Sequence, residues 1–527
     1  MVEATGCDRG VPSGPTGTVS ARHARGFGAA GAPAYDRRTM TRTSTRSGWM
    51  AIAVALVIGA GATAAAGRDH DKIPITTASS EARALYLQAR DLLDKQRAAD
   101  SHKRFETAVA RDPDFALGYL GLADTAPSPR EFFAALDRAV ALADQASEPE
   151  RLMIRGRRAG ATGKTDQQKE LYTRLAEAYP RDERALALLA SFYSSQQDFA
   201  RAVELYTRAV AINPGFTSAY NLLGYAYRAL ERYGEAEKTF QKYIELCPGD
   251  PNPYDSYAEL LMKTGRFDES IRSYEKALAI DRHFVSAYIG IASDHLFSGR
   301  TQEARKVLAR LARIARDDAE RRQAMAWTAE SFIYERAWDR ALGEINEMLA
   351  LDDQASDYAR KSIDLNFRGY VLLEAGRADD AAAAFQAQIE ASDRSTSPDE
   401  VKEGVRRYTL YDQARVALAK RDLITAKACA ASYARQVAAR QLPGEIRWLH
   451  ELAGRIALAD GKPRVAVAEL TQANQQDPRV LYLHAAALVE AGDAENARTA
   501  IRKAAEWNAL SLHYGFVRAK AQALARS

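Results

Sequence analysis

The feature that most constrains the fold is a spacing of about 34 residues that recurs without a gap through the middle of the chain. The stretch YNLLGYAYRALERYGEAEKTFQKYIELCP begins at Tyr220, and YDSYAELLMKTGRFDESIRSYEKALAIDR begins at Tyr254. The same interval separates the members of two further series: Ala202, Ala236, Ser270 and Ala304, and Pro180, Pro214 and Pro248. A period of this length is typical of helical hairpins, which bury their apolar faces by stacking on one another. The spacing therefore predicts one array of stacked hairpins.

A unit that begins at Thr217 shows how each hairpin is built. Tyr220 and Leu223 are its fourth and seventh residues, so they fall on one face of a helix. Gly224 is eighth and Ala236 is twentieth, and small residues at these places let the two helices of a hairpin approach closely. The pattern resembles the tetratricopeptide repeat (TPR) family. That resemblance implies an all-α fold, an α-solenoid of stacked helix-turn-helix hairpins that forms a right-handed superhelix.

The resemblance covers most of the chain. The most regular block is 149–318, which divides into the units 149–182, 183–216, 217–250, 251–284 and 285–318. With looser units on both sides, the repeats extend over 82–511 as about twelve hairpins. Residues 512–527 are expected to form a capping helix that gives the last unit a more polar outer face.

The N-terminal leader has a different composition. Residues 1–39 are rich in Gly, Ala, Pro, Ser and Arg, which predicts a disordered basic extension. Met40 is an alternative start, in which case that extension is not translated. Residues 40–66 have a basic beginning, an apolar stretch and a tail of small residues, which is the pattern of a signal peptide. Residues 67–81 are then a linker to the first hairpin.

A membrane anchor is the competing interpretation of the leader. The apolar run 49–66 is near the minimum length for a membrane span, which is about 18 residues. In both interpretations positive charge precedes the apolar run, so the chain beyond that run is exported. We expect a periplasmic or extracytoplasmic protein, either cleaved from this segment or tethered to the membrane by it.

The charge of the repeats is balanced. Residues 1–66 carry seven Arg and three acidic residues, whereas the remainder carries 66 basic and 66 acidic residues. The net charge of +4 therefore belongs to the leader, and the repeats give no reason to expect nucleic-acid binding.

The resemblance also implies a binding groove. In the TPR family, the second, fifth, ninth and twelfth residues of the first helix line the concave face. By that resemblance the candidate groove residues are Asn221, Tyr225, Arg228, Asn252, Asp255 and Glu259. The alternative is that they are ordinary exposed polar residues. Asp255 and Glu259 place acid where the basic clamp of the family's chaperone-tail binders would need base, so that partner is not implied.

No chemistry of an enzyme is recognisable in the sequence. The stretch GATGKT at Gly160–Thr165 has Arg158 where a phosphate-binding loop needs its first Gly, and its context is helical. We predict a turn between helices there, and no cofactor or metal site. The leading hypothesis is a non-catalytic scaffold of the cell envelope that binds a peptide or partner protein in a concave groove. The alternative is an extracytoplasmic sensor module that binds a small ligand or glycan.

Overall fold

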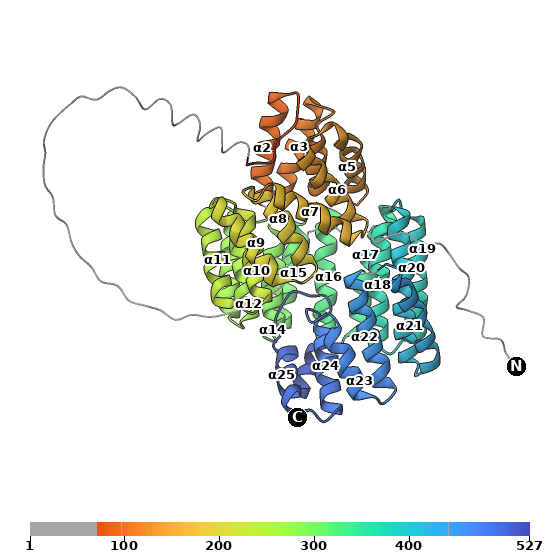
Figure 1. The fold of residues 1–527 in the computed structure, drawn as a ribbon. Coiled ribbons are helices and arrows are strands. Elements are labelled where there is room, and N and C mark those ends of the chain that lie inside the picture. The colour runs from red at the N-terminus through yellow and green to blue at the C-terminus, as the bar shows by residue number, and fades with distance from the viewer. Residues whose placement is uncertain (1–70, 96, 128, 441, 527) are drawn as a thin grey trace, which may run out of the picture.

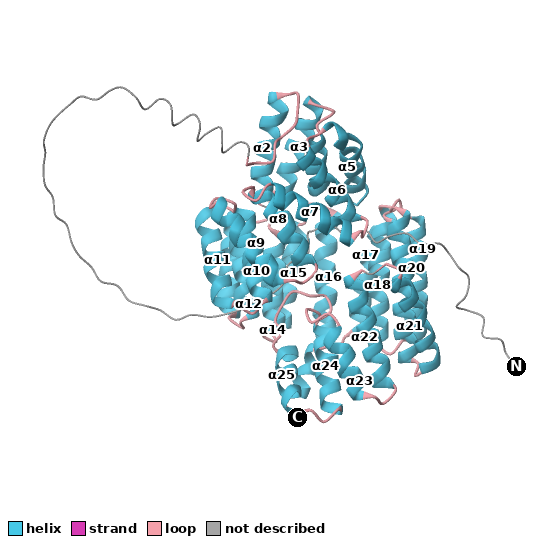
Figure 2. Ribbon diagram, viewed as in Figure 1, coloured by secondary structure: helices cyan, strands magenta, loops and turns pink. Residues whose placement is uncertain are grey.

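The computed structural model describes residues 71–95, 97–127, 129–440 and 442–526, and these ranges contain helices and no strand. Helices adjacent in the chain pair into hairpins, and twelve hairpins lie within the described part of the chain. Figure 1 shows them stacked side by side in chain order, and Figure 2 shows the short loops that join them. The predicted all-α solenoid is confirmed.

The hairpins have the following bounds. The first four are α2 (Ser80–Asp94) with α3 (Ala98–Arg111), α4 (Ala116–Thr125) with α5 (Pro129–Leu142), α6 (Glu148–Ala161) with α7 (Thr165–Ala178), and α8 (Glu183–Ser195) with α9 (Phe199–Ile212). The next four are α10 (Thr217–Ala229) with α11 (Tyr233–Leu246), α12 (Pro251–Lys263) with α13 (Phe267–Ile280), α14 (Val285–Phe297) with α15 (Thr301–Ile314), and α16 (Asp318–Tyr334) with α17 (Trp338–Gln354). The last four are α18 (Tyr358–Glu374) with α19 (Ala378–Arg394), α20 (Asp399–Ala419) with α21 (Leu423–Ala438), α22 (Pro443–Ala459) with α23 (Pro463–Gln472), and α24 (Pro478–Glu490) with α25 (Ala494–Ala505). A 3-10 turn, η1 (Ala143–Gln145), follows α5, and α26 (Arg518–Leu524) is the last helix.

The packing inside a hairpin explains the recurrent small residues. Ala236 is fully buried between α10 and α11. A Cβ atom on Gly224 would lie 2.5 Å from the ring of Phe240, closer than packed atoms approach. Glycine at the eighth place therefore allows an aromatic ring of the second helix to lie directly on the backbone of the first.

The array curves until its ends lie against its middle. Ser218 at the start of α10 donates a hydrogen bond to Asp94 at the end of α2, at 2.9 Å. At the opposite edge of the same hairpin, the Lys503 ammonium of α25 lies 2.7 Å from the Glu231 carboxylate. Figure 1 shows this arrangement: the last hairpins, in blue, lie below α12 and α14. Successive turns of the superhelix are therefore in contact.

The C-terminal segment, residues 506–524, differs from the expected capping helix over 512–527. Its helix, α26, begins at Arg518 and packs on α25, but residues 506–517 are not helical. Trp507, Tyr514 and Phe516 join the largest hydrophobic core together with residues of α14, α16 and α18. The segment thus buries aromatic side chains between distant hairpins, where the expectation was a polar outer face.

The predictions about the leader concern residues 1–66, which lie outside the described residues, as do 67–70 of the predicted linker. Within the described ranges, no helix has the length and apolar character needed to cross a membrane.

Candidate functional site

The candidate groove residues lie on α10 and α12, at the inner side of the array, where first helices of neighbouring hairpins contact each other. Tyr225 is half-buried. The other five are buried: Asn221, Arg228, Asn252, Asp255 and Glu259. They are therefore not the ordinary exposed polar residues of the alternative interpretation. Their part in ligand binding stays a prediction.

These buried side chains make contacts within the array. Arg228 donates a hydrogen bond from Nη1 to Glu259 Oε2 at 3.1 Å, and both side chains are 1% exposed. The Arg228 guanidinium also lies over the Tyr225 ring, 5.0 Å from its centre. Asn252 donates to the Tyr243 hydroxyl at 3.1 Å. The polar residues at these positions therefore join α10 to α12 and α12 to α11.

A second surface, not anticipated from the sequence, carries a bound segment of the chain. It is formed mainly by the ends of four successive first helices, and we call it the rim: Lys263 of α12, Phe297 of α14, Glu330 and Tyr334 of α16, Trp338 at the start of α17, and Tyr370 and Glu374 of α18. Residues 506–520 of the C-terminal segment lie across the rim, and Figure 1 shows them in dark blue between α14 and α24. The signal that could have indicated this contact is the aromatic content of LSLHYGFVR, which follows no helical spacing.

Hydrogen bonds hold the backbone of the C-terminal segment on the rim. Gly515 N–H donates to Glu330 Oε1 at 2.9 Å, and Lys263 Nζ donates to the Trp507 carbonyl at 2.8 Å. Because Glu330 is completely buried, desolvation raises its pKa to about 8. Two side chains of the rim therefore hold main-chain groups of the C-terminal segment.

Arg518 and Lys520 contribute charged contacts. Arg518 Nη2 donates to the carbonyl oxygen of Phe297 at 3.0 Å, and Phe297 is the last residue of α14. The end of a helix has carbonyl groups without partners in the helix and a partial negative charge, which a guanidinium stabilises. Lys520 Nζ lies 2.7 Å from Glu374 Oε2.

Aromatic contacts fill the space between these hydrogen bonds. The Tyr514 ring packs edge-to-face on Phe297 at 5.7 Å and on Trp507 at 5.2 Å. The Phe516 ring lies over Trp338 at 6.5 Å. Aromatic pairs of this kind contribute about 0.5–1.5 kcal/mol beyond the area that they bury.

A polar cluster lies beside the rim where His513 contacts Tyr370, at 5.6 Å between ring centres. The Tyr370 hydroxyl donates to Asp412 Oδ1 at 3.0 Å, and burial raises the pKa of Asp412 to about 7. The guanidinium groups of Arg415 and Arg479 lie 4.4 Å and 5.4 Å from the same Tyr370 ring. Among the described residues, neither Arg415 Nη1 nor Arg479 Nη1 has a hydrogen-bond partner.

The N-terminal end of the described chain is bound in a comparable way. Ile73 N–H donates to Asp182 Oδ2 at 2.8 Å, and Arg184 donates to the Ile73 carbonyl at the same distance. Thr76 N–H donates to Glu150 Oε1 at 2.7 Å. Glu150 and Asp182 lie at the starts of α6 and α8, so this non-helical segment crosses two hairpins.

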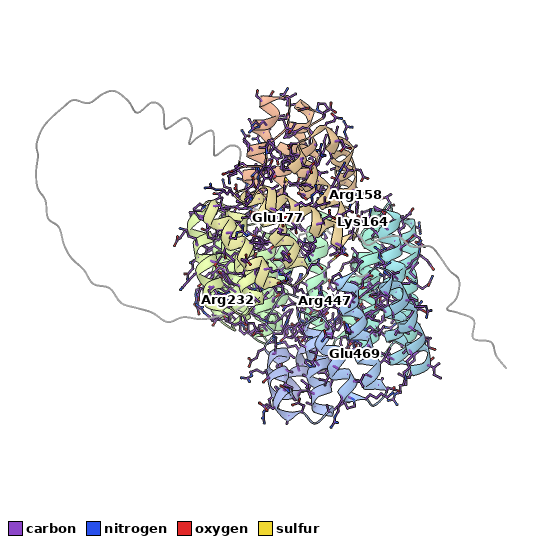
Figure 3. The ribbon with its side chains drawn as sticks, in the orientation of Figure 1. Arg158, Lys164, Glu177, Arg232, Arg447 and Glu469 are labelled. Atoms are coloured by element: carbon purple, nitrogen blue, oxygen red, sulfur yellow. The ribbon has the colours of Figure 1, made fainter. Side chains whose placement is uncertain are left out.

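The stretch Gly160–Thr165 contains the turn between α6 and α7, residues 162–164, as predicted. Gly163 has a φ of +69°, and α7 begins at Thr165. Arg158 forms an ion pair with Asp137 at 2.6 Å, and Figure 3 labels Arg158 and Lys164 near this edge of the array. Within the described ranges, no group of three His, Cys, Asp or Glu side chains is arranged to hold a metal ion.

Stacked hairpins of this kind define an α-solenoid repeat protein, a class whose extended surfaces bind partners. Tetratricopeptide repeat models match residues 86–147, 155–215, 193–251 and 261–328. The chain therefore contains tetratricopeptide repeats, and these repeats support the role of a protein-interaction scaffold. No curated protein matches the chain.

Solved structures with similar stretches include three repeat proteins. A tetratricopeptide repeat protein from Parabacteroides merdae is 18% identical, and the match covers 51% of this chain and 93% of that one with a TM-score of 0.33. A thermophilic TPR protein from Thermus thermophilus is 22% identical, with 34% and 98% covered and a TM-score of 0.30. YrrB, described as a TPR protein with an unusual peptide-binding site, is 18% identical, with 34% and 92% covered and a TM-score of 0.25.

Proposed function

We propose that this protein is a non-catalytic scaffold that binds a partner protein through an extended peptide of that partner. The observation that carries the proposal is the C-terminal segment on the rim. Its main-chain groups pair with Glu330 and Lys263, and its aromatic side chains pack between hairpins. A surface that holds an extended segment of its own chain has the chemistry to hold one from another protein.

A small-molecule sensor is the second candidate function. A cavity of about 500 Å³ lies between α17, α18 and α19, and its wall includes Tyr358, Lys361, Arg368 and Arg394. This volume is within the range of ligand pockets. The cavity is open to solvent and its wall is charged, so it supports this function less well than the occupied rim supports peptide binding.

We also propose that the scaffold works outside the cytoplasm. The pattern of residues 40–66 supports export, either with cleavage near Gly67 or with the apolar run retained as a tether. N-terminal sequencing of the native protein checks this. A mature chain that begins near Gly67 would support cleavage, and recovery of peptides from 1–39 in exported protein would contradict the use of Met40.

Site-specific photo-crosslinking in the native cell envelope tests the binding function. A photoreactive phenylalanine is placed at Trp338 on the rim and, in a separate variant, at Ile424, which is 84% exposed on α21. We expect a discrete crosslinked partner from position 338 and none from position 424. Equal crosslinking from both positions, or none from either, would contradict a partner-binding rim.

A further inference from the structure

We propose that the rim binds partner peptides that carry aromatic anchors followed by basic residues. Residues 506–520 occupy this binding site and must dissociate from it before such a partner binds. The inference rests on the proposed function, because it names the chemistry of the partner for the same surface. Three features of the rim support it: its contacts with residues 506–520, the charge that it favours in a bound segment, and the polar atoms that residues 506–520 leave without hydrogen-bond partners.

The contacts define the shape of the preferred peptide. The segment WNALSLHYGFVRAK places Trp507, Tyr514 and Phe516 against the core of the rim, and all three are buried. Gly515 separates two of these anchors, and a Cβ atom there would lie 2.8 Å from Glu330 Oε1 and 2.9 Å from the Tyr334 ring. The rim therefore accepts a small residue between two large rings.

The charges of the rim favour a basic partner. Arg518 binds the carbonyl end of α14, and Lys520 pairs with Glu374. An acidic residue at either place would face a helix C-terminus or a carboxylate, and both would repel it. Complementary charge at the edge of a surface selects partners as well as adding affinity.

The resident segment leaves polar atoms of the site unsatisfied. Among the described residues, Glu330 Oε2 has no hydrogen-bond partner, and the same holds for the Nη1 atoms of Arg415 and Arg479 beside His513. A buried polar atom without a partner loses its contacts with water and gains nothing in exchange. In addition, residues 506–517 belong to no hairpin, so their release leaves the hydrogen bonds within each hairpin intact. A partner peptide that forms hydrogen bonds with these atoms would therefore bind the rim more favourably than residues 506–520 do.

The substitution Gly515→Leu in the full-length chain tests the inference. Its side chain collides with Glu330 and Tyr334, so it should expel the segment while the hairpins stay folded. Gly343→Leu is the matched control, because nothing lies within 4 Å of a Cβ at Gly343. The probe is a fluorescent peptide that copies residues 506–520, and its binding is measured by fluorescence anisotropy.

We expect the peptide to bind Gly515→Leu at least about tenfold more tightly than it binds the wild type or Gly343→Leu. A peptide with Leu at its own Gly515 position, and another with Glu at its Arg518 and Lys520 positions, should bind at least about tenfold more weakly than the copy. Equal binding to all three proteins, or indifference to these peptide changes, would overturn the inference.

Hydrogen exchange of the wild type provides a second test that needs no variant. Amides of 506–517 should exchange faster than those of α14 and α16, because the segment opens separately. Exchange of all three only on global unfolding would overturn the inference. If photo-crosslinking from position 338 finds a partner but the copy peptide fails, the scaffold function stands and the proposed peptide chemistry is wrong.

Discussion

Glu231 and Lys503 are separated by about half of the chain, yet Glu231 Oε1 lies 2.7 Å from Lys503 Nζ, across the contact between two turns of the superhelix. Glu231 is in the turn between α10 and α11 with a φ of +58°, and Gln197 has a φ of +65° at the same place one repeat earlier. The equivalent residues of three other repeats are glycines with positive φ: Gly163, Gly265 and Gly299. Gln197 also reaches the last hairpins, donating to Asn474 at 2.9 Å. Among these five turns, the two that carry a strained side chain each use it to contact a hairpin near the C-terminal end of the array.

We predict that the double substitution Gln197→Gly and Glu231→Gly loosens the contact between these two turns and the last hairpins without destabilising the hairpins themselves. Glycine relieves a left-handed strain of about 1 kcal/mol at each turn, whereas an exposed ion pair contributes about 0–1 kcal/mol. The thermal midpoint should stay constant or rise, and the radius of gyration from small-angle X-ray scattering should increase. Unchanged dimensions in the double variant would contradict the prediction.

The control for this prediction is Arg421→Gly. Arg421 lies in the turn between α20 and α21 with a φ of +59°, so glycine relieves the same strain there. Unlike Glu231, it forms no ion pair with another hairpin in the described part of the chain. The control should therefore change stability but not dimensions.

The fold could be predicted because the residue spacings that specify it lie within one repeat and recur along the chain. Gly224 and Phe240 are sixteen residues apart, and that spacing alone indicates a ring packed on a neighbouring backbone. The first helices of four successive hairpins begin at the interval of the repeat: α8 at Glu183, α10 at Thr217, α12 at Pro251 and α14 at Val285. Each hairpin depends mainly on its neighbours, so a short pattern is sufficient to specify the array.

The site could not be predicted in the same way, because its geometry depends on the summed small rotations of each hairpin relative to the next. Whether Asp255 or Glu259 faces a groove or a neighbouring helix is decided by how tightly the superhelix winds. The rim is even harder to predict from the repeat pattern, because Glu330 and Gly515 meet only when the intervening hairpins curve back on themselves. No residue spacing within one repeat predicts the contact between these two residues.

We predict that Ala202→Trp unfolds part of the array whereas Ala200→Trp is tolerated. Ala202 is fully buried at the twentieth place of its unit, and Ala200, two residues earlier in α9, is exposed. Overpacking a buried seam costs about 1–3 kcal/mol, and the same indole in solvent has little to displace. Circular dichroism melting of both variants measures the difference. Similar losses in the two proteins would mean that the repeat register is wrong.

We predict that the buried pair Arg228–Glu259 is needed as a pair. Glu259→Gln leaves the Arg228 charge buried without its carboxylate, and removing one partner of such a pair costs about 3–5 kcal/mol. Replacing both residues, as Arg228→Met with Glu259→Leu, removes both charges, so urea unfolding should show most of the stability restored. A double variant as unstable as the single one would show that the two side chains act independently.

We predict that Glu330→Gln stabilises the protein increasingly as pH rises from about 5 to 8. Burial raises the pKa of Glu330 from 4.5 to about 8 in the folded protein. Below pH 4.5 the carboxyl is protonated in both states, so the variant should match the wild type. Between these values the unfolded chain releases the proton and the folded chain keeps it, so wild-type stability falls by up to about 1.4 kcal/mol per pH unit.

Denaturant unfolding at about pH 5 and pH 8 measures this change, because a glutamine at position 330 still accepts the hydrogen bond from Gly515 and carries no titrating proton. Glu335→Gln is the control in the next turn. The hydrogen bond from Arg305 lowers the pKa of Glu335 from 4.5, so the carboxylate stabilises the fold above that pH, and its loss should weaken the fold at both pH values, the opposite direction. A pH-independent difference between Glu330→Gln and the wild type would show that Glu330 does not hold its proton on the rim.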